Sequence, residues 1–187
     1  MALYHHSALY YNPLAMSDSS PMMQQYERIK AQHQDAILFF RMGDFYEMFR
    51  SDAVEASRIL SLTLTQRQGI PMCGIPWHSS QNYLQRLLAA GKKIAICEQT
   101  SVPGKAKGIV ERKVVQVVSP GTLVDDAFLA AGEHNYLVSV SSPDQGTLGL
   151  AFLDLSTGEL GTRLSPLSGA RETLLAEIAA RNPRELV

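Results

Sequence analysis

The sequence contains little cysteine, no long apolar run and almost no net charge. Cys73 and Cys97 each stand alone in an apolar stretch, without the CxxC or Cys/His spacing of a metal site. We therefore expect reduced structural thiols and no bound metal. No segment reaches the roughly 18 consecutive apolar residues that a membrane span requires, and no signal-peptide pattern opens the chain. These absences favour a cytoplasmic protein that has no membrane partner.

Two further features limit the function. The sequence has no GxxxxGK[ST] phosphate-binding motif, so we expect no nucleotide cofactor and no ATPase activity in this chain. The formal net charge is −1, but residues 1–124 carry 13 basic and 9 acidic side chains, whereas residues 125–187 carry 4 and 9. The positive surplus of the first part permits contact with phosphate without arguing for it.

Alternating helical and strand-like patterns run through the first part of the chain, which at 187 residues is long enough for one or two domains. Asp52, with Glu55 three residues later, predicts a helix N-cap, and Gly91 stands where a left-handed C-cap belongs. The expected elements, in order, are a disordered leader at 1–20, a helix from Pro21, a buried strand at 36–42, a helix at 52–60, a half-buried strand at 62–65, a shaped loop or edge segment at 69–76, a helix from Ser79 or Ser80, and strands at 94–97 and 110–118.

Past the turn at 119–122 the pattern changes to three strand-like runs, a helix and the start of a further strand at 185–187. The helix is expected to end at Asn182 and Pro183. The runs lie at 135–142, 147–155 and 159–164, and the apolar face of the helix comprises Leu174, Leu175, Ile178 and Ala179. Both units are therefore α/β: a mixed β-sheet with surrounding helices, followed by a truncated α/β unit.

Residues 43–49, Gly-Asp-Phe-Tyr-Glu-Met-Phe, directly follow the apolar strand at 36–42. If this segment is extended, Phe45, Glu47 and Phe49 share one face, and Tyr46 and Met48 point toward the other. An aromatic ring and a carboxylate then project together. From spacing alone, an ordinary edge strand with a buried Phe45 and a solvated Glu47 is the favoured interpretation.

Several uncommon motifs follow one another along the chain: PMMQQY (21–26), FRMGDFYE (40–47), GIPWH (74–78), AICEQ (95–99), VERKVV (110–115) and PGT (120–122), followed by LDLSTG (153–158) and NPREL (182–186). In this order they resemble the N-terminal region of the MutS family of DNA mismatch-recognition proteins. The resemblance covers residues 20–187. It implies a mismatch-recognition domain at 21–122, a linker at 123–133 and part of a connector domain with a ribonuclease-H-like fold at 134–187.

The resemblance implies a role for two residues in recognising a mispair. Phe45 matches an aromatic wedge that enters the minor groove and stacks on the mispaired base, and Glu47 matches a carboxylate that hydrogen-bonds that base. An apolar wedge suits this task because a mispaired base is easier to unstack and a weakened step is easier to kink. Phosphate repulsion and desolvation should raise the pKa of Glu47, so that it binds partly protonated.

Further DNA contacts are implied near this pair, although ordinary loop packing also fits them. They are Met42, Asp44, Arg67, Met72, Gly74, Ile75, Pro76 and His78. Between Arg67 and Ile70 only Gln68 and Gly69 remain, where many members of the family have a longer insertion. Six basic residues are candidate phosphate contacts, but solvated surface explains most such side chains: Lys92, Lys93, Lys105, Lys107, Arg112 and Lys113.

The family also sets expectations for the whole protein. The resemblance implies a longer protein that binds ATP and Mg through a C-terminal ATPase domain, forms a homodimer, recruits the MutL partner through the connector and binds mismatched duplex DNA. This chain alone is expected to have no catalytic residues and to bind DNA weakly. Two alternatives remain: a family paralogue that binds other DNA or RNA structures, and a metal-dependent nuclease that uses Asp154 and Glu159.

Overall fold

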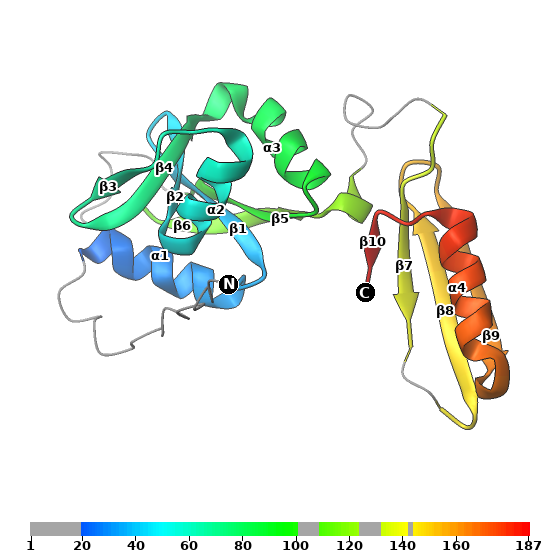
Figure 1. Ribbon diagram of the computed structural model, residues 1–187. Helices are drawn as coiled ribbons and strands as arrows, with labels where there is room; N and C mark the ends of the chain where they lie inside the picture. The colour runs from blue at the N-terminus through cyan, green and yellow to red at the C-terminus, as the bar shows by residue number, and fades with distance from the viewer. Residues whose placement is uncertain (1–19, 101–108, 124–131, 142–143) are drawn as a thin grey trace, which may run out of the picture.

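The computed structural model describes residues 20–100, 109–123, 132–141 and 144–187, which form two α/β units joined near residue 120 (Figure 1). The expected leader, apart from Ser20, lies outside these residues, as do Lys105, Lys107 and most of the expected linker at 123–133. Within the described ranges, no helix is long and apolar enough to cross a membrane.

The first unit is a six-stranded mixed sheet with the strand order β3-β4-β2-β1-β5-β6. Strands β1 and β5 are parallel, and the other neighbouring pairs are antiparallel. Its elements in chain order are α1 (Pro21–Gln32), β1 (Ala36–Met42), β2 (Phe45–Phe49), α2 (Arg50–Leu60), β3 (Thr65–Arg67), β4 (Ile70–Pro76), the 3-10 turn η2 (Trp77–Ser79), α3 (Ser80–Ala89), β5 (Lys93–Gln99) and β6 (Arg112–Val118). The predicted mixed α/β fold is confirmed here.

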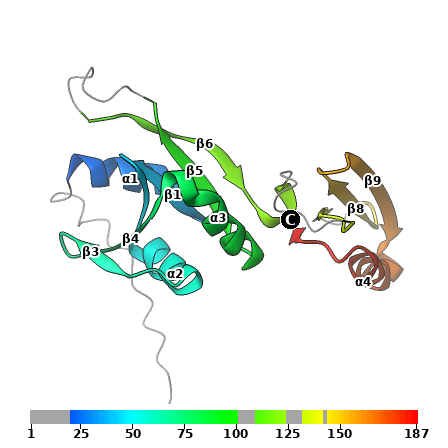
Figure 2. The ribbon, with the colours of Figure 1, turned by 90° about the horizontal axis from the view of Figure 1, so that it is seen from above.

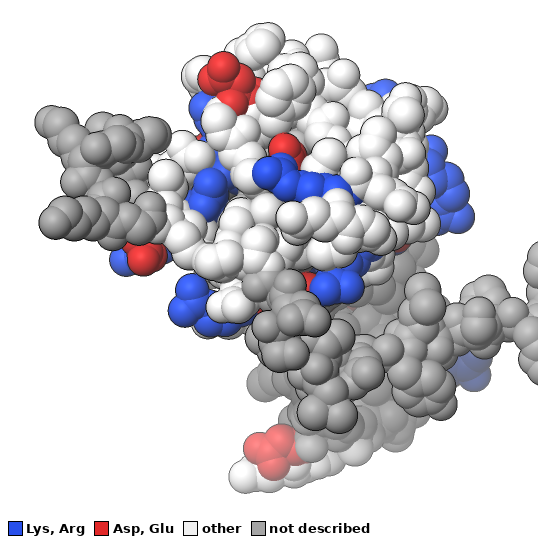
Figure 3. Space-filling model, turned by 90° about the vertical axis from the view of Figure 1, so that its left-hand side faces the viewer, with Lys and Arg blue, Asp and Glu red and all other residues white. Residues whose placement is uncertain are grey.

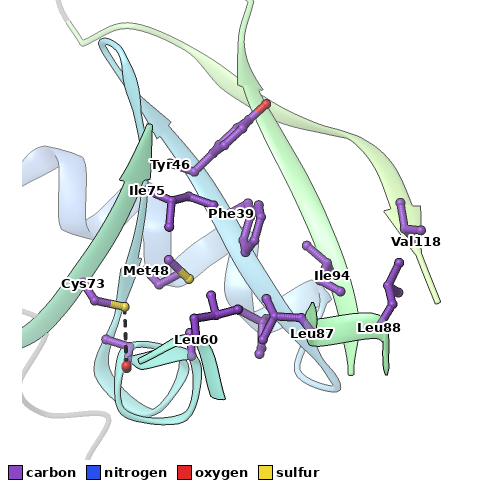
Figure 4. Packing of buried hydrophobic residues seen from close by; sticks show 13 residues of the cluster. Phe39, Tyr46, Met48, Leu60, Cys73, Ile75, Leu87, Leu88, Ile94 and Val118 are labelled. Atoms are coloured by element: carbon purple, nitrogen blue, oxygen red, sulfur yellow. Dashed lines mark hydrogen bonds between the residues drawn. The ribbon is translucent and has the colours of Figure 1, made fainter. Parts of the chain in front are cut away.

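Helices pack on both faces of this sheet because its central strands are apolar on both faces. In β1, Ile37 and Phe39 belong to the core that includes α2 and α3, whereas Leu38 and Phe40 belong to the core on the side of α1. Figure 2 shows the layers from above, and Figure 4 shows the first of these cores from close by. The burial of residues 36–40 was predictable, because continuous apolar runs are typical of strands covered on both sides.

The two cysteines are free and buried, one in each core. Burial raises the pKa of the Cys73 thiol to about 11 and that of Cys97 to about 12. A thiol with such a pKa is protonated near neutral pH and is a poor nucleophile. Both residues therefore act as small apolar side chains, as the sequence predicts.

The predicted ends of two helices are confirmed. The hydroxyl of Ser20, which caps α1, accepts a hydrogen bond from the Met23 amide at 3.4 Å. After α3, Gly91 has a φ of +75°, and the amide of Lys92 donates to the Leu87 carbonyl at 3.0 Å. A left-handed residue at this position satisfies the last carbonyls of a helix.

The prediction that Asp52 caps a helix is wrong. Helix α2 already begins at Arg50, and the Asp52 carboxylate is buried. It accepts hydrogen bonds from the Leu38 amide at 2.9 Å and the Tyr26 hydroxyl at 3.3 Å, and it pairs with Lys30 at 2.8 Å. Asp52 thus connects α1, β1 and α2.

The prediction of a shaped loop or edge segment at 69–76 is wrong, because residues 70–76 form an interior strand and only Gly69 lies in a turn. Strand β4 pairs with β2 on one side and with β3 on the other. Its two prolines are tolerated because Pro71 lies opposite Gln66 of the short edge strand β3 and Pro76 is the last residue of the strand. The half-buried strand predicted at 62–65 starts later, as the exposed β3.

The second unit is a four-stranded mixed sheet, order β10-β7-β8-β9, with one helix against it. Its elements are β7 (Tyr136–Val140), β8 (Thr147–Asp154), β9 (Glu159–Pro166), η4 (Leu167–Gly169), α4 (Ala170–Arg181) and β10 (Glu185–Leu186). The helix packs its Leu174 against a small core, but Leu175, predicted to face that core, is exposed. On β9, Leu160 and Leu164 are 69% and 76% exposed, and no described element covers them.

The two units meet at the turn η3 (Pro120–Thr122). Glu185 of β10 accepts a hydrogen bond from the Gly121 amide at 3.1 Å and pairs with Lys93 of β5 at 3.5 Å. The Asn135 side-chain amide donates to the carbonyls of Pro120 and Leu123. A Cβ on Gly121 would lie 2.8 Å from the Glu185 Cβ, so glycine permits this close approach.

Candidate nucleic-acid interface

A tight hairpin turn presents Phe45 at the end of the first sheet. Met42, the last residue of β1, pairs with Phe45, the first residue of β2, so the turn contains only Gly43 and Asp44. Gly43 has a φ of +57°, a conformation that glycine adopts at little cost. The turn therefore fixes the position along the sheet at which the side chains of β2 begin.

Alternation along β2 divides its side chains as the sequence predicts. Tyr46 and Met48 are buried in the core with α2 and α3. Phe49 is fully buried beneath α1, but Phe45, on the same face, is 47% exposed. Because β2 lies between β4 and β1, the interpretation as an ordinary edge strand with a buried Phe45 is wrong. Helix α1 leaves this end of the face open.

Cross-strand pairing assembles further candidates around Phe45. We define the probe face by residues that share one side of the sheet: Met42, Phe45, Glu47, Met72, Gly74 and Pro76. At Gly74 a Cβ would lie 3.7 Å from the Glu47 Cγ and 3.9 Å from Phe45, so glycine keeps the space between these two side chains open. The structure thus brings six predicted site residues onto one surface.

Arg67 reaches the probe face from the neighbouring strand. Gln68 and Gly69 both have positive φ, at +51° and +78°, as a two-residue type I′ hairpin turn requires. This turn pairs β3 tightly with β4 and brings Arg67 Nη1 to 3.1 Å from Glu47 Oε2 and 4.0 Å from Met42 Sδ. The shortened turn between β3 and β4 therefore has a defined geometry, and it gives Glu47 a cationic partner.

Glu47 is a partly desolvated carboxylate. Its side chain is only 16% exposed. Burial raises the pKa of Glu47 above its ordinary value, and the charges of Arg67 and Arg112 only partly offset this effect. A carboxyl group with a raised pKa takes up a proton more readily when it approaches further negative charge.

Three predicted site residues lie off the probe face. Ile75 is fully buried and points into the core with Phe39 and Met48 (Figure 4), so its side chain cannot touch DNA in this structure. The sequence prediction fails there because alternation within β4 assigns Ile75 to the opposite face from Gly74. Asp44, in the hairpin turn, and His78, after β4, are exposed beside the face.

The basic candidates divide in a similar way. Arg112 is buried rather than free for phosphate: it donates to the Arg41 carbonyl at 2.6 Å and to Gln25 at 2.9 Å, and its guanidinium lies over the Phe40 ring. Lys92 and Lys93 sit at the opposite end of the sheet from Phe45 and pair with acids. Figure 3, which faces the side that carries β3, shows separate Lys and Arg groups among mostly uncharged surface.

In the second unit, Asp154 has a structural role. Asp154 is fully buried, and its carboxylate accepts hydrogen bonds from Ser156, the Asn135 amide and the His134 ring. Burial alone would raise the pKa of Asp154, but these hydrogen bonds outweigh it and lower the pKa to about 2. Within the described ranges, no three His, Cys, Asp or Glu side chains gather as a metal site would require. The described residues therefore do not give Asp154 the clustered carboxylates that hold two metals in a nuclease.

Sequence reasoning missed Arg41 and Trp77. Their cationic and aromatic side chains lie together beside the hairpin, with the Arg41 guanidinium 4.4 Å from the centroid of the Trp77 ring. Their motifs, FRMGDFYE and GIPWH, lie far apart along the chain, so no local spacing indicated that the two side chains stack.

The candidate site thus combines an exposed aromatic residue with a partly desolvated carboxylate on the open part of a mixed sheet. Comparison with known families specifies the class: residues 20–127 match the model described as MutS domain I, and residues 135–187 match MutS domain II. The chain belongs to the MutS family, and the predicted resemblance is confirmed.

Curated relatives agree with this assignment. The chain is 50% identical to the DNA mismatch repair protein MutS of Treponema denticola and 49% identical to that of Bacillus subtilis, each over 177 residues. It is 51% identical to the protein of that name from Shouchella clausii over 172 residues. These alignments cover 90 to 92% of the chain and 20% of each relative. The chain thus spans about a fifth of the length of the relatives it matches.

Proposed function

We propose that this chain recognises mispaired or unpaired bases in duplex DNA as part of a MutS-type mismatch repair protein. One observation carries the proposal: the large apolar ring of Phe45 is about half exposed on an interior strand, beside the partly desolvated carboxylate of Glu47. The exposed ring adjoins the half-buried Met42 and Met72, and a contiguous apolar surface of this kind favours a binding role. The name of the curated relatives supports the same function.

Phe45 acts as the wedge in this proposal. Inserting an apolar side chain at a base step requires the step to unstack, which costs a few kcal/mol and least at a mispair. Phe45 therefore senses the stacking and pairing that a mispair has lost, and not the sequence. The open space at Gly74 and the half-buried side chains of Met42 and Met72 offer apolar surface to the groove beside the wedge.

Glu47 supplies the polar contact. In free protein Arg67 pairs with it, and burial has already raised its pKa. Approaching phosphates raise the pKa further because they repel the ionised form. Glu47 then binds a proton and donates a hydrogen bond to a ring nitrogen of the base on which Phe45 stacks.

The remaining expectations follow from the family. We propose that residues 21–122 form the mismatch-recognition domain and that the second unit is part of a ribonuclease-H-like connector; its three antiparallel strands followed by a helix and a parallel strand support this. The longer protein would be a homodimeric ATPase that uses ATP and Mg and recruits MutL through the connector. This chain would contribute recognition and no catalytic residue.

Duplex binding by wild type, Phe45→Ala and Val54→Ala tests the proposal in a full-length context. Val54 is similarly exposed but lies on α2, away from the probe face, and so serves as the matched control. Fluorescence anisotropy with a duplex that carries one G·T mispair and with its paired counterpart gives the two affinities. We expect wild type and Val54→Ala to prefer the mispair and Phe45→Ala to lose about tenfold or more of that preference. Equal affinities of wild type for both duplexes would contradict the proposal.

A further inference from the structure

A cation–aromatic stack lies behind the hairpin turn, on the side of the sheet opposite Phe45. The Arg41 guanidinium lies 4.4 Å from the centroid of Trp77 and 5.7 Å from that of Tyr46. The Arg41 side chain is only 15% exposed, and it also approaches Glu98 at 3.8 Å. Glu98 in turn accepts a hydrogen bond from the Tyr46 hydroxyl, so the guanidinium is held from several directions.

Each partner of this stack holds one residue of the two-residue turn. The Arg41 Nε donates to the Gly43 carbonyl at 2.6 Å, and the Trp77 amide donates to the Asp44 carbonyl at 2.9 Å. Phe45 follows Asp44 directly and pairs across the sheet with Pro76, the residue before Trp77. The position of the Phe45 backbone therefore depends on the same two contacts.

A turn of this kind needs such support. Gly43 has a positive φ, and a Cβ added to it would meet nothing within 4 Å. Gly43 therefore makes no side-chain contact that would restrict the backbone of the turn. If the hairpin turn moves easily, the Phe45 ring can lie in the groove of paired DNA without unstacking any base pair. A wedge held rigidly can bind only where the step opens, because a binding group is selective when it is preorganised.

We propose that Arg41 and Trp77 are positioning residues that brace the hairpin turn from behind, so that the rigidity of Phe45 sets the discrimination between mispaired and paired DNA. This inference rests on the proposed function. Arg41 and Trp77 do not touch the mispaired base in this proposal. They hold the turn that positions Phe45, and Phe45 alone makes the contact.

Four variants in a full-length context test the brace. Arg41→Met removes the charge and the Nε donor, and Trp77→Leu removes the ring but keeps the backbone amide. Trp77→Tyr keeps an aromatic ring and is the conservative rescue. Arg86→Met is the matched control, because Arg86 also donates to a backbone carbonyl, that of Ile59 at 2.9 Å, but joins α2 and α3 away from Phe45. Affinities for the G·T and paired duplexes are compared with melting temperatures.

The expected result is a change in selectivity. Arg41→Met and Trp77→Leu should lower the ratio of mispaired to paired affinity by about threefold to tenfold, as the loss of a partly buried cation–π contact predicts. Trp77→Tyr should stay within about twofold of wild type, and Arg86→Met should leave the ratio unchanged even if it lowers the melting temperature. In the full-length protein, the part of the tryptophan emission that Trp77→Tyr removes belongs to Trp77, and greater acrylamide quenching of that part in Arg41→Met would report loss of the stack.

Two outcomes overturn the inference. One is that Arg41→Met and Trp77→Leu lower both affinities in proportion and leave the ratio unchanged, as a merely structural role would. The other is that Arg41→Met increases quenching of Trp77 while selectivity stays at the wild-type value. Phe45→Ala in the same assay distinguishes a failure of this inference from a failure of the proposed function. If wild type and Arg41→Met both discriminate between the duplexes and Phe45→Ala does not, only this inference fails.

Discussion

At the scale of single residues, Phe45 and Glu47 share a strand face but differ in their surroundings. Helix α1 covers Phe49 but does not reach Phe45, which is therefore exposed. Glu47 is enclosed by neighbouring strands and paired with Arg67. The two side chains can therefore play separate parts, one apolar and one dependent on protonation. The raised pKa of Glu47 in the free protein gives the second part a physical basis.

Glu47→Gln should strengthen binding to paired duplex by about fivefold near neutral pH, because it removes a negative charge from the surroundings of the phosphates. The pKa of wild-type Glu47 is raised, so its side chain is neutralised as the pH falls through that value. The advantage of the variant should then disappear. Paired-duplex affinities measured across pH test this, with the exposed Glu133→Gln as control. An affinity of Glu47→Gln that equals wild type at every pH would contradict the protonation of Glu47 on DNA.

The sequence predicted the faces of β2 but not those of β4. The period of two separated Phe45 and Glu47 from Tyr46 and Met48, and this division holds in the structure, but spacing alone favoured a buried Phe45 and did not predict its exposure. Ile75 could not be assigned to a face in the same way, because the prolines and glycines at 69–76 indicated a loop or edge segment where the structure has a strand. Arg67 was a candidate from its motif, but its pairing with Glu47 depends on the register between β3 and β4.

At the scale of elements, the attachment of α1 determines how much of the sheet face is left open. The buried Asp52 of α2 accepts from Tyr26 and pairs with Lys30, both on α1, and it also accepts from the Leu38 amide in β1. Sequence spacing suggested a local cap, because the acid lies near the start of a helix. Its true partners come from 14 to 26 residues away, which local patterns do not reveal.

Asp52→Ala should lower the free energy of unfolding by about 3 kcal/mol, because it leaves Lys30 and a backbone amide without their buried partner. Urea denaturation followed by circular dichroism measures this change. Asp35→Ala is the control, since Asp35 pairs with Lys93 in a largely exposed ion pair, and its loss should change the stability by less than about 1 kcal/mol. Equal losses in the two variants would mean that the Asp52 network does not hold α1 in place.

At the scale of the whole molecule, two sheets are joined through a short turn that contains Gly121. The order of the motifs predicted both units, and the comparisons with MutS domains I and II agree with that order. The contact between Glu185 and Lys93 was beyond sequence analysis, because the residues are 92 positions apart and lie in different units. The exposed Leu175 departs from the expected apolar face of the helix. On β9, Leu160 and Leu164 are exposed as well, and the described residues include only one helix against the second sheet.

Gly121→Ala should weaken the junction, because its Cβ would lie 2.8 Å from the Glu185 Cβ and 3.1 Å from the Leu137 Cβ. Overpacking of this kind lowers the free energy of unfolding by about 2 kcal/mol. Gly169→Ala, where nothing lies within 4 Å of the added Cβ, should cost less than about 1 kcal/mol. Scanning calorimetry compares the variants, and identical transitions for Gly121→Ala and wild type would show that the units do not depend on this contact.

The central claim is that the Phe45 ring stacks on a mispaired base. The most direct measurement is an NMR experiment on the protein with selectively labelled phenylalanine, mixed with saturating duplex that carries one G·T mispair. We expect intermolecular NOEs between the Phe45 ring and the mispaired base, together with ring-current shifts that are absent with paired duplex. Saturated binding of the mispaired duplex with no NOE from the Phe45 ring to any base would contradict the claim.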